Sequence, residues 1–247
     1  MNLFFRSMLY ILLVYSLAFF GLSLIKEGSI MNLSFRPHGL IHICLLVNVF
    51  LTLLAYPLIP LLERIFGFTS EITLVELTDL DRPLLRDMSI KAPGTLQHSL
   101  QVANLSEAAA KAINANALLV KVAALYHDIG KTLHPLNFIE NQSNGNPHDE
   151  TSDLDSAKAI IEHITEGEKM AKKAGLPEVI TDFITTHHGT TRVEYFYRQH
   201  LEKHPDEETD ESQFRYPGPK PQTKEQAILM VADSVEAAAK SIKQPTE

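Results

Sequence analysis

Residues 123–131 read AALYHDIGK, and this stretch decides how the rest of the chain is interpreted. In it, His127 and Asp128 stand side by side after an apolar run at helical spacing, and Gly130 ends the run two residues later. Imidazole and carboxylate together suit a divalent transition metal. Because a carboxylate has two oxygens, one aspartate can bridge two ions. A lone His-Asp pair occurs by chance in many proteins, so the prediction depends on further ligands elsewhere in the chain.

Further histidines and a second aspartate supply such ligands on separate segments. The candidate metal ligands are His98, His127, Asp128, His163, His187, His188 and Asp233. Most of them continue apolar stripes at helical spacing, as His98 does with Val102, so they are expected to face the interior. The simplest alternative for any one of them is a core histidine with satisfied hydrogen bonds.

The joint pattern favours metal binding over that alternative. Five segments turn imidazole or carboxylate groups toward one core, and each polar group buried without a partner costs roughly 1–3 kcal/mol. Seven ligands exceed the needs of one tetrahedral zinc site and suit two octahedral ions that share a bridging carboxylate. Mixed imidazole and carboxylate donors favour iron or manganese over calcium or magnesium. We therefore predict two divalent transition-metal ions, iron or manganese, as cofactors.

The composition narrows the class of partner. The 247 residues carry a formal net charge of −8, which argues against a nucleic-acid polymer as a partner. Six of the ten residues 202–211 are acidic, a pattern typical of a solvated loop. The single cysteine, Cys44, excludes an internal disulfide.

Two uncharged runs near the N-terminus predict membrane-spanning helices. Residues 7–25 are nineteen residues without a charge, about the length of a spanning helix. Residues 39–62 form a second run, free of Asp, Glu, Lys and Arg. A signal peptide is the alternative for the first run, but no small-residue cleavage site follows it. A buried pair of soluble helices is the alternative for both runs.

We therefore predict a transmembrane hairpin over residues 1–65 in a multi-pass protein of the cell membrane, with the lipid bilayer as a partner. Basic residues are more numerous outside the connecting loop than inside it. This bias places both ends of the hairpin, and the metal-binding domain, in the cytoplasm. No oligomeric state is predicted.

From residue 66 onward the pattern predicts helices only. Residues 66–92 are interpreted as an amphipathic connector and residues 93–247 as one helical domain. The predicted helices of that domain span 95–113, 116–129, 153–173, 177–188 and 192–203, and a last one begins at 223. Thr95, Asn116 and Asp153 are the predicted caps of the first three, and residues 223–226 form a capping box. The predicted fold class is all-α: two N-terminal transmembrane helices followed by a helical domain.

Several longer stretches resemble one known family. They read LIPLLERIFGFT (58–69), LTDLDRPLLRDM (77–88), APGTLQHSLQVANLSEAAA (92–110), YHDIGK (126–131), FIENQ (138–142), GNPHD (145–149), DFITTHHGTTRVEYFY (182–197) and ADSVEAAAKS (232–241). Through them, residues from about 60 to 243 resemble the seven-transmembrane HD hydrolases, the membrane branch of the HD-domain phosphohydrolases that degrade cyclic di-AMP. The related HD-GYP enzymes, which act on cyclic di-GMP, carry a Gly-Tyr-Pro signature after the His-His pair. Here residues 188–195 read HGTTRVEY, which lacks the signature and favours cyclic di-AMP.

The resemblance implies a helical HD domain with a two-metal site and assigns the ligands to the ions. One ion is expected on His98, His127 and Asp233, and the other on His163, His187 and His188, with Asp128 as the bridge. Members of that family carry an extracellular domain and seven membrane helices, so the chain is expected to be a fragment of a longer protein.

The resemblance also implies the reaction, which is hydrolysis of cyclic di-AMP to pApA. Two bound ions lower the pKa of a shared water, and the resulting hydroxide attacks phosphorus in line with the leaving 3′-oxygen. Asp128 and Lys131 are the predicted catalytic residues, and Lys131, Asn141 and Gln142 are the predicted substrate-binding residues. For Lys131 the alternative is a helix C-terminal cation that faces water. For Asn141 and Gln142 it is a polar loop.

Three other functions are compared with this one. An HD-type nucleotidase acting on mononucleotides would share the metal ligands. The absence of one of the metal-binding residues would favour a membrane module that senses a nucleotide without turnover. All seven of these residues are present. A structural membrane anchor accounts for the first 65 residues but not for the histidines.

Overall fold

The computed structural model describes residues 2–27, 35–143 and 145–241. These residues form two compact units, Met1–Ser70 and Glu71–Glu247. In the described residues both units are helical, and the one strand-like pairing is an isolated bridge between Arg192 and Arg215. The predicted all-helical class is therefore confirmed for this part of the chain.

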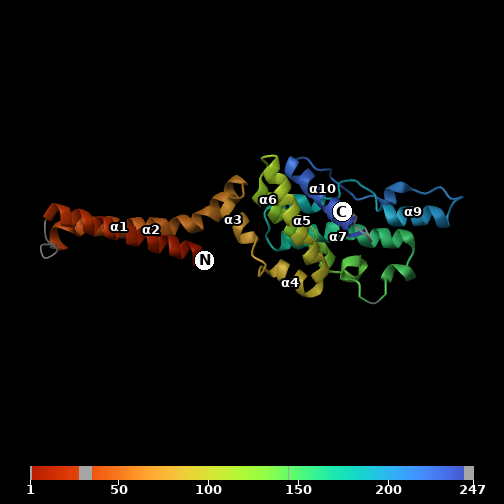
Figure 1. The fold of residues 1–247 in the computed structure, drawn as a ribbon, viewed down its shortest axis with the longest axis horizontal. Helices are drawn as coiled ribbons and strands as arrows, with labels where there is room; N and C mark the ends of the chain where they lie inside the picture. Colours follow the sequence, from red (N-terminus) through yellow and green to blue (C-terminus); the bar gives the residue numbers. More distant parts are fainter. Residues whose placement is uncertain (1, 28–34, 144, 242–247) are drawn as a thin grey trace, which may run out of the picture. The chain divides into compact units, whose positions relative to one another are not determined.

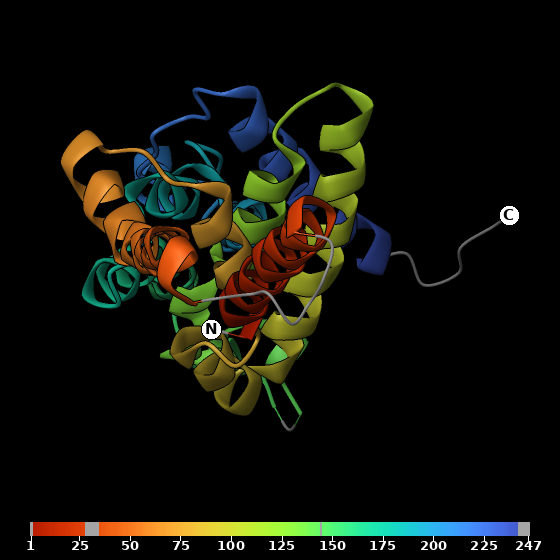
Figure 2. The ribbon, with the colours of Figure 1, turned by 90° about the vertical axis from the view of Figure 1, so that its left-hand side faces the viewer.

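The N-terminal unit is a pair of long helices. α1 (Asn2–Glu27) packs alongside α2 (Phe35–Phe66) (Figure 1; Figure 2). Large apolar side chains of both helices are exposed, among them Leu17, Ile43 and Phe50. Within the described residues, no helix has the length and apolar character needed to cross a membrane, so the two predicted spans are not confirmed. Residues 28–34, in the predicted connecting loop, lie outside the described residues.

The second compact unit begins at Glu71, within the predicted connector. α3 (Glu71–Leu77) and α4 (Pro83–Lys91) occupy most of the predicted connector. They bury Leu77, Leu85 and Met88 in the main hydrophobic core, and the Tyr126 hydroxyl donates a hydrogen bond to the Leu77 carbonyl at 3.0 Å. The apolar faces of these two helices are therefore buried within the second compact unit, and the predicted start of the HD domain at residue 93 stays a prediction.

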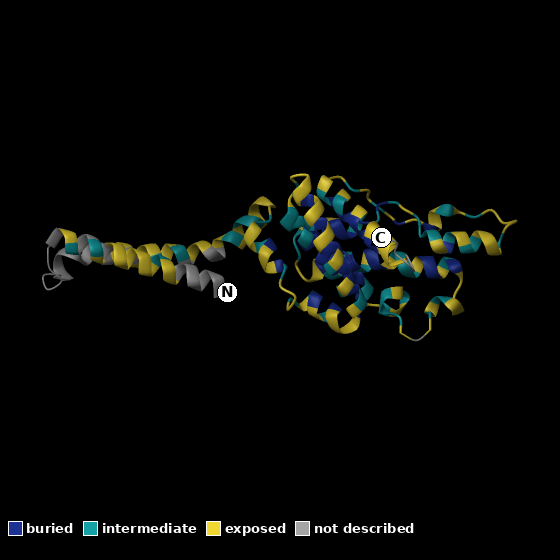
Figure 3. Ribbon diagram, viewed as in Figure 1, coloured by how far each residue is buried: buried dark blue, intermediate teal, exposed yellow. Residues whose placement is uncertain are grey.

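The remaining helices complete the second unit, and most of them carry or adjoin the candidate ligands. They are α5 (Pro93–Ala112), α6 (Ala117–Tyr126), α7 (Asp153–Lys173), α8 (Glu178–Thr186), α9 (Glu194–Lys203) and α10 (Lys224–Ser241). Short 3-10 turns lie between them: η2 (Ile129–Thr132), η3 (Pro135–Asn137), η4 (Ile139–Asn141), η5 (Pro147–Glu150) and η6 (Glu211–Phe214). α5 packs along α6, and α10 packs against both (Figure 1). α7 packs against α8 and η2. The buried residues concentrate where these helices meet (Figure 3).

Two of the predicted helix starts are confirmed. The Asn116 side chain accepts a hydrogen bond from the Leu119 N–H at 3.0 Å. At the start of α10, Thr223 Oγ1 accepts from the Gln226 N–H at 3.1 Å, and Gln226 Oε1 accepts from the Thr223 N–H at 3.3 Å. This reciprocal pair is the predicted capping box.

Two other predicted caps are wrong. α5 begins at Pro93, before Thr95, because the fixed φ of proline suits the first helical position and its missing N–H needs no partner there. At α7 the cap is Ser152 and not Asp153, because Ser152 Oγ accepts the Asp155 N–H at 3.1 Å. In both cases a neighbouring residue in the chain fits the terminal position better.

α6 ends at Tyr126, three residues before the predicted end. His127 and Asp128 therefore lie in the turn between α6 and η2 and not within the helix. The chain continues into η2, where a Cβ on Gly130 would lie 1.9 Å from the His163 carbonyl oxygen. A residue without a side chain is therefore required for η2 to approach α7 so closely. The approach brings Asp128 Oδ1 within 3.4 Å of His163 Nε2.

Candidate metal centre

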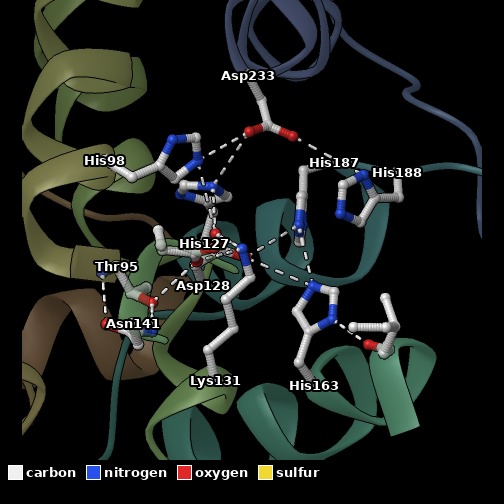
Figure 4. A network of polar contacts seen from close by, with 12 residues as sticks. Thr95, His98, His127, Asp128, Lys131, Asn141, His163, His187, His188 and Asp233 are labelled. Carbon is white, nitrogen blue, oxygen red and sulfur yellow. Dashed lines mark hydrogen bonds and ion pairs between the residues drawn. The ribbon is translucent and has the colours of Figure 1, made fainter. Parts of the chain in front are cut away.

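All seven candidate ligands converge inside the helical domain (Figure 4). α5 supplies His98, the turn after α6 supplies His127 and Asp128, α7 supplies His163, the end of α8 supplies His187 and His188, and α10 supplies Asp233. Their ligand atoms form three overlapping groups, each lying within 4.8 Å: His163, His187 and His188; His98, His127 and Asp128; His127, His187 and Asp233. The structure thus brings every predicted ligand together, and their binding of metal stays a prediction.

Asp128 lies between two groups of imidazoles and turns one oxygen toward each. Its Oδ2 is 3.2 Å from His127 Nε2 and 3.6 Å from His98 Nε2. Its Oδ1 is 3.4 Å from His163 Nε2 and 3.6 Å from His187 Nε2. This is the arrangement expected of a carboxylate that bridges two ions.

Asp233 lies across the site from Asp128 (Figure 4). Its Oδ1 is 2.9 Å from His98 Nε2 and 3.8 Å from His127 Nε2. Its Oδ2 is 3.8 Å from His188 Nδ1, in the other group. Asp233 therefore faces the two histidines with which it is predicted to share an ion.

The backbone of their own segments orients three of the histidines. The Nδ1 atoms of His127, His163 and His187 pair with the carbonyl three residues earlier, at 2.8, 2.5 and 2.9 Å respectively. His127 and His187 follow helix ends, where the last carbonyls have no partner within the helix. Because Nδ1 donates to a carbonyl, it carries the proton of the neutral ring, and in that form Nε2 keeps its lone pair for a metal ion.

Two buried atoms at the centre have no hydrogen-bond partner in the described structure: His127 Nε2 and Asp128 Oδ1. Their contacts at 3.2 Å and 3.4 Å lack hydrogen-bond geometry. Each unsatisfied buried group costs roughly 1–3 kcal/mol, and a divalent ion bound to these atoms removes that cost. Imidazole and carboxylate are also donors that transition metals accept. The residues present therefore fit a centre of divalent metal ions.

Burial and neighbouring charges set the protonation of the donors. Burial lowers the pKa of His163 to about 3 and also lowers the pKa of His188, so both rings are neutral and able to bind metal near neutral pH. Burial lowers the pKa of His127 as well, but the carboxylates of Asp128 and Asp233 outweigh it and raise that pKa to about 10. A proton on His127 therefore competes with a metal ion, and metal binding releases it.

Lys131 points toward the centre and not toward water. Its Nζ is 2.7 Å from Asp128 Oδ2, 3.1 Å from Glu140 Oε1 and 4.9 Å from the centroid of the Phe138 ring. Its side chain is 12% exposed, which excludes the alternative of a water-facing cation. Burial opposes its charge, but Asp128 and Glu140 outweigh burial and raise its pKa above the usual value. The site therefore holds a permanent positive charge, whose contact with a substrate stays a prediction.

Asn141 and Gln142 make contacts within the chain. Asn141 Oδ1 accepts the Thr95 N–H at 3.2 Å, and its Nδ2 donates to Thr95 Oγ1 at 2.8 Å. Asn141 thus caps the start of α5 from 46 residues away. Gln142 Nε2 donates to the Leu136 carbonyl at 2.9 Å and to Asn146 Oδ1 at 3.0 Å. Both amides hold the loop at the edge of the site, and their binding of substrate stays a prediction.

The sequence patterns do not single out two residues that contact the ligands. Glu236 Oε2 lies 2.6 Å from His98 Nδ1, and the Tyr216 ring stacks on the His188 ring with centroids 4.2 Å apart. Glu236 follows Asp233 by three residues on α10, and this spacing puts both on one helix face, so a signal for it exists. No comparable signal marks Tyr216, because it reaches the site from the loop before α10.

Comparison with known proteins identifies the fold. A family model described as the HD domain matches residues 95–238. The chain belongs to the HD-domain family. It is 49% identical over 195 residues to the cyclic-di-AMP phosphodiesterase PgpH of Listeria monocytogenes serotype 1/2a (strain 10403S), which covers 78% of this chain and 27% of that protein. It is also 49% identical over 189 residues to PgpH of Bacillus subtilis (strain 168), which covers 76% and 26% respectively.

A solved structure extends this similarity to three dimensions. The crystal structure of the L. monocytogenes PgpH HD domain in complex with cyclic-di-AMP matches with a TM-score of 0.65 and 49% identity, over 68% of this chain and 78% of that one. The predicted resemblance to HD-domain phosphohydrolases is thereby confirmed at the level of the HD domain. The chain spans about a quarter of the length of the curated relatives it matches, at 27% and 26%. The seven-transmembrane architecture stays a prediction.

Proposed function

We propose that this chain hydrolyses cyclic di-AMP to linear pApA with the help of two divalent transition-metal ions, iron or manganese. The observation that carries the proposal is the position of Asp128, whose two oxygens each face one group of imidazoles. The relatives support the substrate, because two of them are cyclic-di-AMP phosphodiesterases and a similar HD domain has been solved with cyclic-di-AMP. No specific observation favours the nucleotidase or the sensor, so these are outcomes of the test.

Each part of the site has a distinct task in this proposal. When bound, the two ions supply an activated water as the nucleophile and neutralise charge on the phosphate oxygens. His98, His127 and Asp233 would hold one ion, and His163, His187 and His188 the other, with Asp128 between them. Lys131 keeps its ammonium group 2.7 Å from Asp128, where it can stabilise negative charge that develops on the phosphate. No side chain needs to act as a nucleophile.

A single turnover of the full chain in ¹⁸O-labelled water tests this proposal. Because water and not a side chain attacks phosphorus, we expect one label in the new 5′-phosphate of pApA. Chelation is expected to abolish turnover, added Mn²⁺ to restore it, and cyclic di-GMP to react more slowly. A metal-loaded, folded chain that binds cyclic di-AMP without cleaving it is a sensor. One that cleaves mononucleotides alone is a nucleotidase.

We also propose that residues 1–65 anchor the chain in the cell membrane, with the HD domain in the cytoplasm. The uncharged runs at 7–25 and 39–62 support this, as do exposed apolar side chains such as Leu17 and Phe50. Protease added to intact cells is therefore expected to spare the chain beyond Arg64 and to cut the acidic loop 202–211 only after lysis. Recovery of the chain without membranes contradicts the anchor, and cleavage of that loop from outside contradicts the orientation.

A further inference from the structure

His98 is held differently from the three histidines that pair with backbone carbonyls. Its Nδ1 pairs with the side chain of Glu236, at 2.6 Å from Oε2, across 138 residues of sequence. Its Nε2 faces Asp233 Oδ1 at 2.9 Å. The two ring nitrogens thus meet two different carboxylates. Asp233 is a candidate metal ligand, whereas Glu236 has no assigned role.

Glu236 is a buried carboxylate with a partner on each oxygen. The residue is 5% exposed. While Oε2 meets His98, Oε1 forms an ion pair with Lys240 Nζ at 2.5 Å, although this contact lacks well-directed hydrogen-bond geometry. A carboxylate this deeply buried is costly unless it is paired. The two partners offset part of that cost, and the hydrogen bond to His98 orients the carboxylate.

The geometry of α10 couples these contacts to the metal centre. Asp233, Glu236 and Lys240 follow one another at spacings of three and four residues, so they lie along one side of the helix. α10 packs against α5, which carries His98. When α10 packs against α5, it therefore places Asp233, a candidate ligand, and Glu236, the hydrogen-bond partner of the ligand His98, beside that histidine.

We infer that Glu236 is a positioning residue of the metal centre: it accepts the Nδ1 proton of His98 and so fixes the ring in the tautomer whose Nε2 is free to bind an ion. Lys240 pairs with the other oxygen of Glu236 and offsets part of the cost of burying its charge. This inference rests on the proposed metal centre. Carboxylates that accept the second ring proton of a ligand histidine orient the ring and increase its basicity, and losing one costs about 10–100-fold in metal affinity.

The first experiment needs neither metal nor substrate. Nitrogen-15 spectra of the histidine rings, recorded on the full chain in metal-free buffer, show which nitrogen of His98 carries the proton. We expect a strongly hydrogen-bonded Nδ1 proton in the wild type. Glu236→Ala should lose that signal, because the remaining carboxylate, Asp233, faces Nε2 at 2.9 Å and favours a proton there. An unchanged His98 spectrum in a folded Glu236→Ala chain overturns the inference.

The second experiment titrates the same chains with Mn²⁺. Glu236→Ala is expected to weaken the binding of one ion by about 10–100-fold and to leave the other ion less affected. Glu236→Gln keeps an acceptor oxygen without the charge, so an intermediate affinity and a weaker Nδ1 hydrogen bond are expected. If Glu236→Ala does not fold, the test rests on Glu236→Gln. The inference is then contradicted if Glu236→Gln has the His98 spectrum and the Mn²⁺ affinity of the wild type.

Glu107→Ala is the matched control, because it removes the same charge from the surface of α5. Glu107 pairs with Lys111 and Lys121, each at 2.6 Å, and is not one of the candidate ligands. The Mn²⁺ affinity of Glu107→Ala should equal that of the wild type. If Glu107→Ala and Glu236→Ala lose the same amount of Mn²⁺ affinity, a local role for Glu236 is contradicted. A chain that binds Mn²⁺ with the expected dependence on Glu236 but does not cleave cyclic di-AMP refutes the proposed function alone.

Discussion

Replacing Asp128 with alanine is expected to lower the metal content of the purified chain from about two ions to about none. Both oxygens of this carboxylate lie close to ligand nitrogens, at 3.2 Å from His127 and 3.4 Å from His163. Two neighbouring dications would repel each other, and the Asp128 carboxylate held near both would offset that repulsion. Elemental analysis measures the loss. Turnover of cyclic di-AMP should fall by at least about 10²–10³-fold, the effect of removing one charge-stabilising group.

Two further variants make this result specific. Asp182→Ala removes an exposed aspartate of α8 and should keep both ions and full turnover. Asp128→Asn keeps one carbonyl oxygen and should retain at most one ion. If folded Asp128→Ala retains the metal content of the wild type, Asp128 is not the bridge. The position of Asp128 between the two groups of imidazoles then no longer supports the proposed function.

Replacing Gly130 with alanine is expected to destabilise the HD domain by about 3 kcal/mol or more. A Cβ here would lie 1.9 Å from the His163 carbonyl oxygen and 2.7 Å from the Gly167 nitrogen. Both are backbone atoms, which cannot rotate away as the end of a side chain does. The turn η2 must therefore move off α7, and Asp128 moves away from His163 with it. Denaturant unfolding measures the loss of stability, and Mn²⁺ titration of the folded fraction should show weakened binding.

Gly21→Ala provides the control for this substitution. Gly21 lies within α1, and a Cβ there would meet no atom within 4 Å. Alanine is favoured over glycine in a helix interior by up to about 1 kcal/mol, so this variant should be neutral or slightly more stable. Equal unfolding midpoints and equal Mn²⁺ affinities for Gly130→Ala and the wild type would show that the contact between η2 and α7 does not position the site.

The features that could be predicted from the sequence are those that depend on a few consecutive residues. Asn116 and the pair Thr223 and Gln226 are recognisable as caps because the donor and the acceptor lie within one turn of the helix. His98 and Asp233 are recognisable as interior residues because helical periodicity shows which face is apolar. The all-helical class and the set of possible ligands follow from such local patterns.

The features that could not be predicted depend on pairs of distant segments. Thr95 has the residue type of a cap, yet its N–H is itself capped by Asn141, 46 residues further on. Residues 71–92 have the pattern of a connector, yet they bury Leu77 and Leu85 in the main core. In both cases the local pattern is compatible with two structures, and a contact with another segment selects one of them.

By itself, therefore, the sequence determines which side chains can bind metal and on which helix faces they lie. The tertiary structure alone decides that Asp128 turns one oxygen toward His127 and the other toward His163. It also decides that a glutamate 138 residues away, and not a backbone carbonyl, meets Nδ1 of His98. The physical reason is that caps and periodicity are local properties of the chain, whereas these contacts arise from the packing of α5, η2, α7 and α10 against one another.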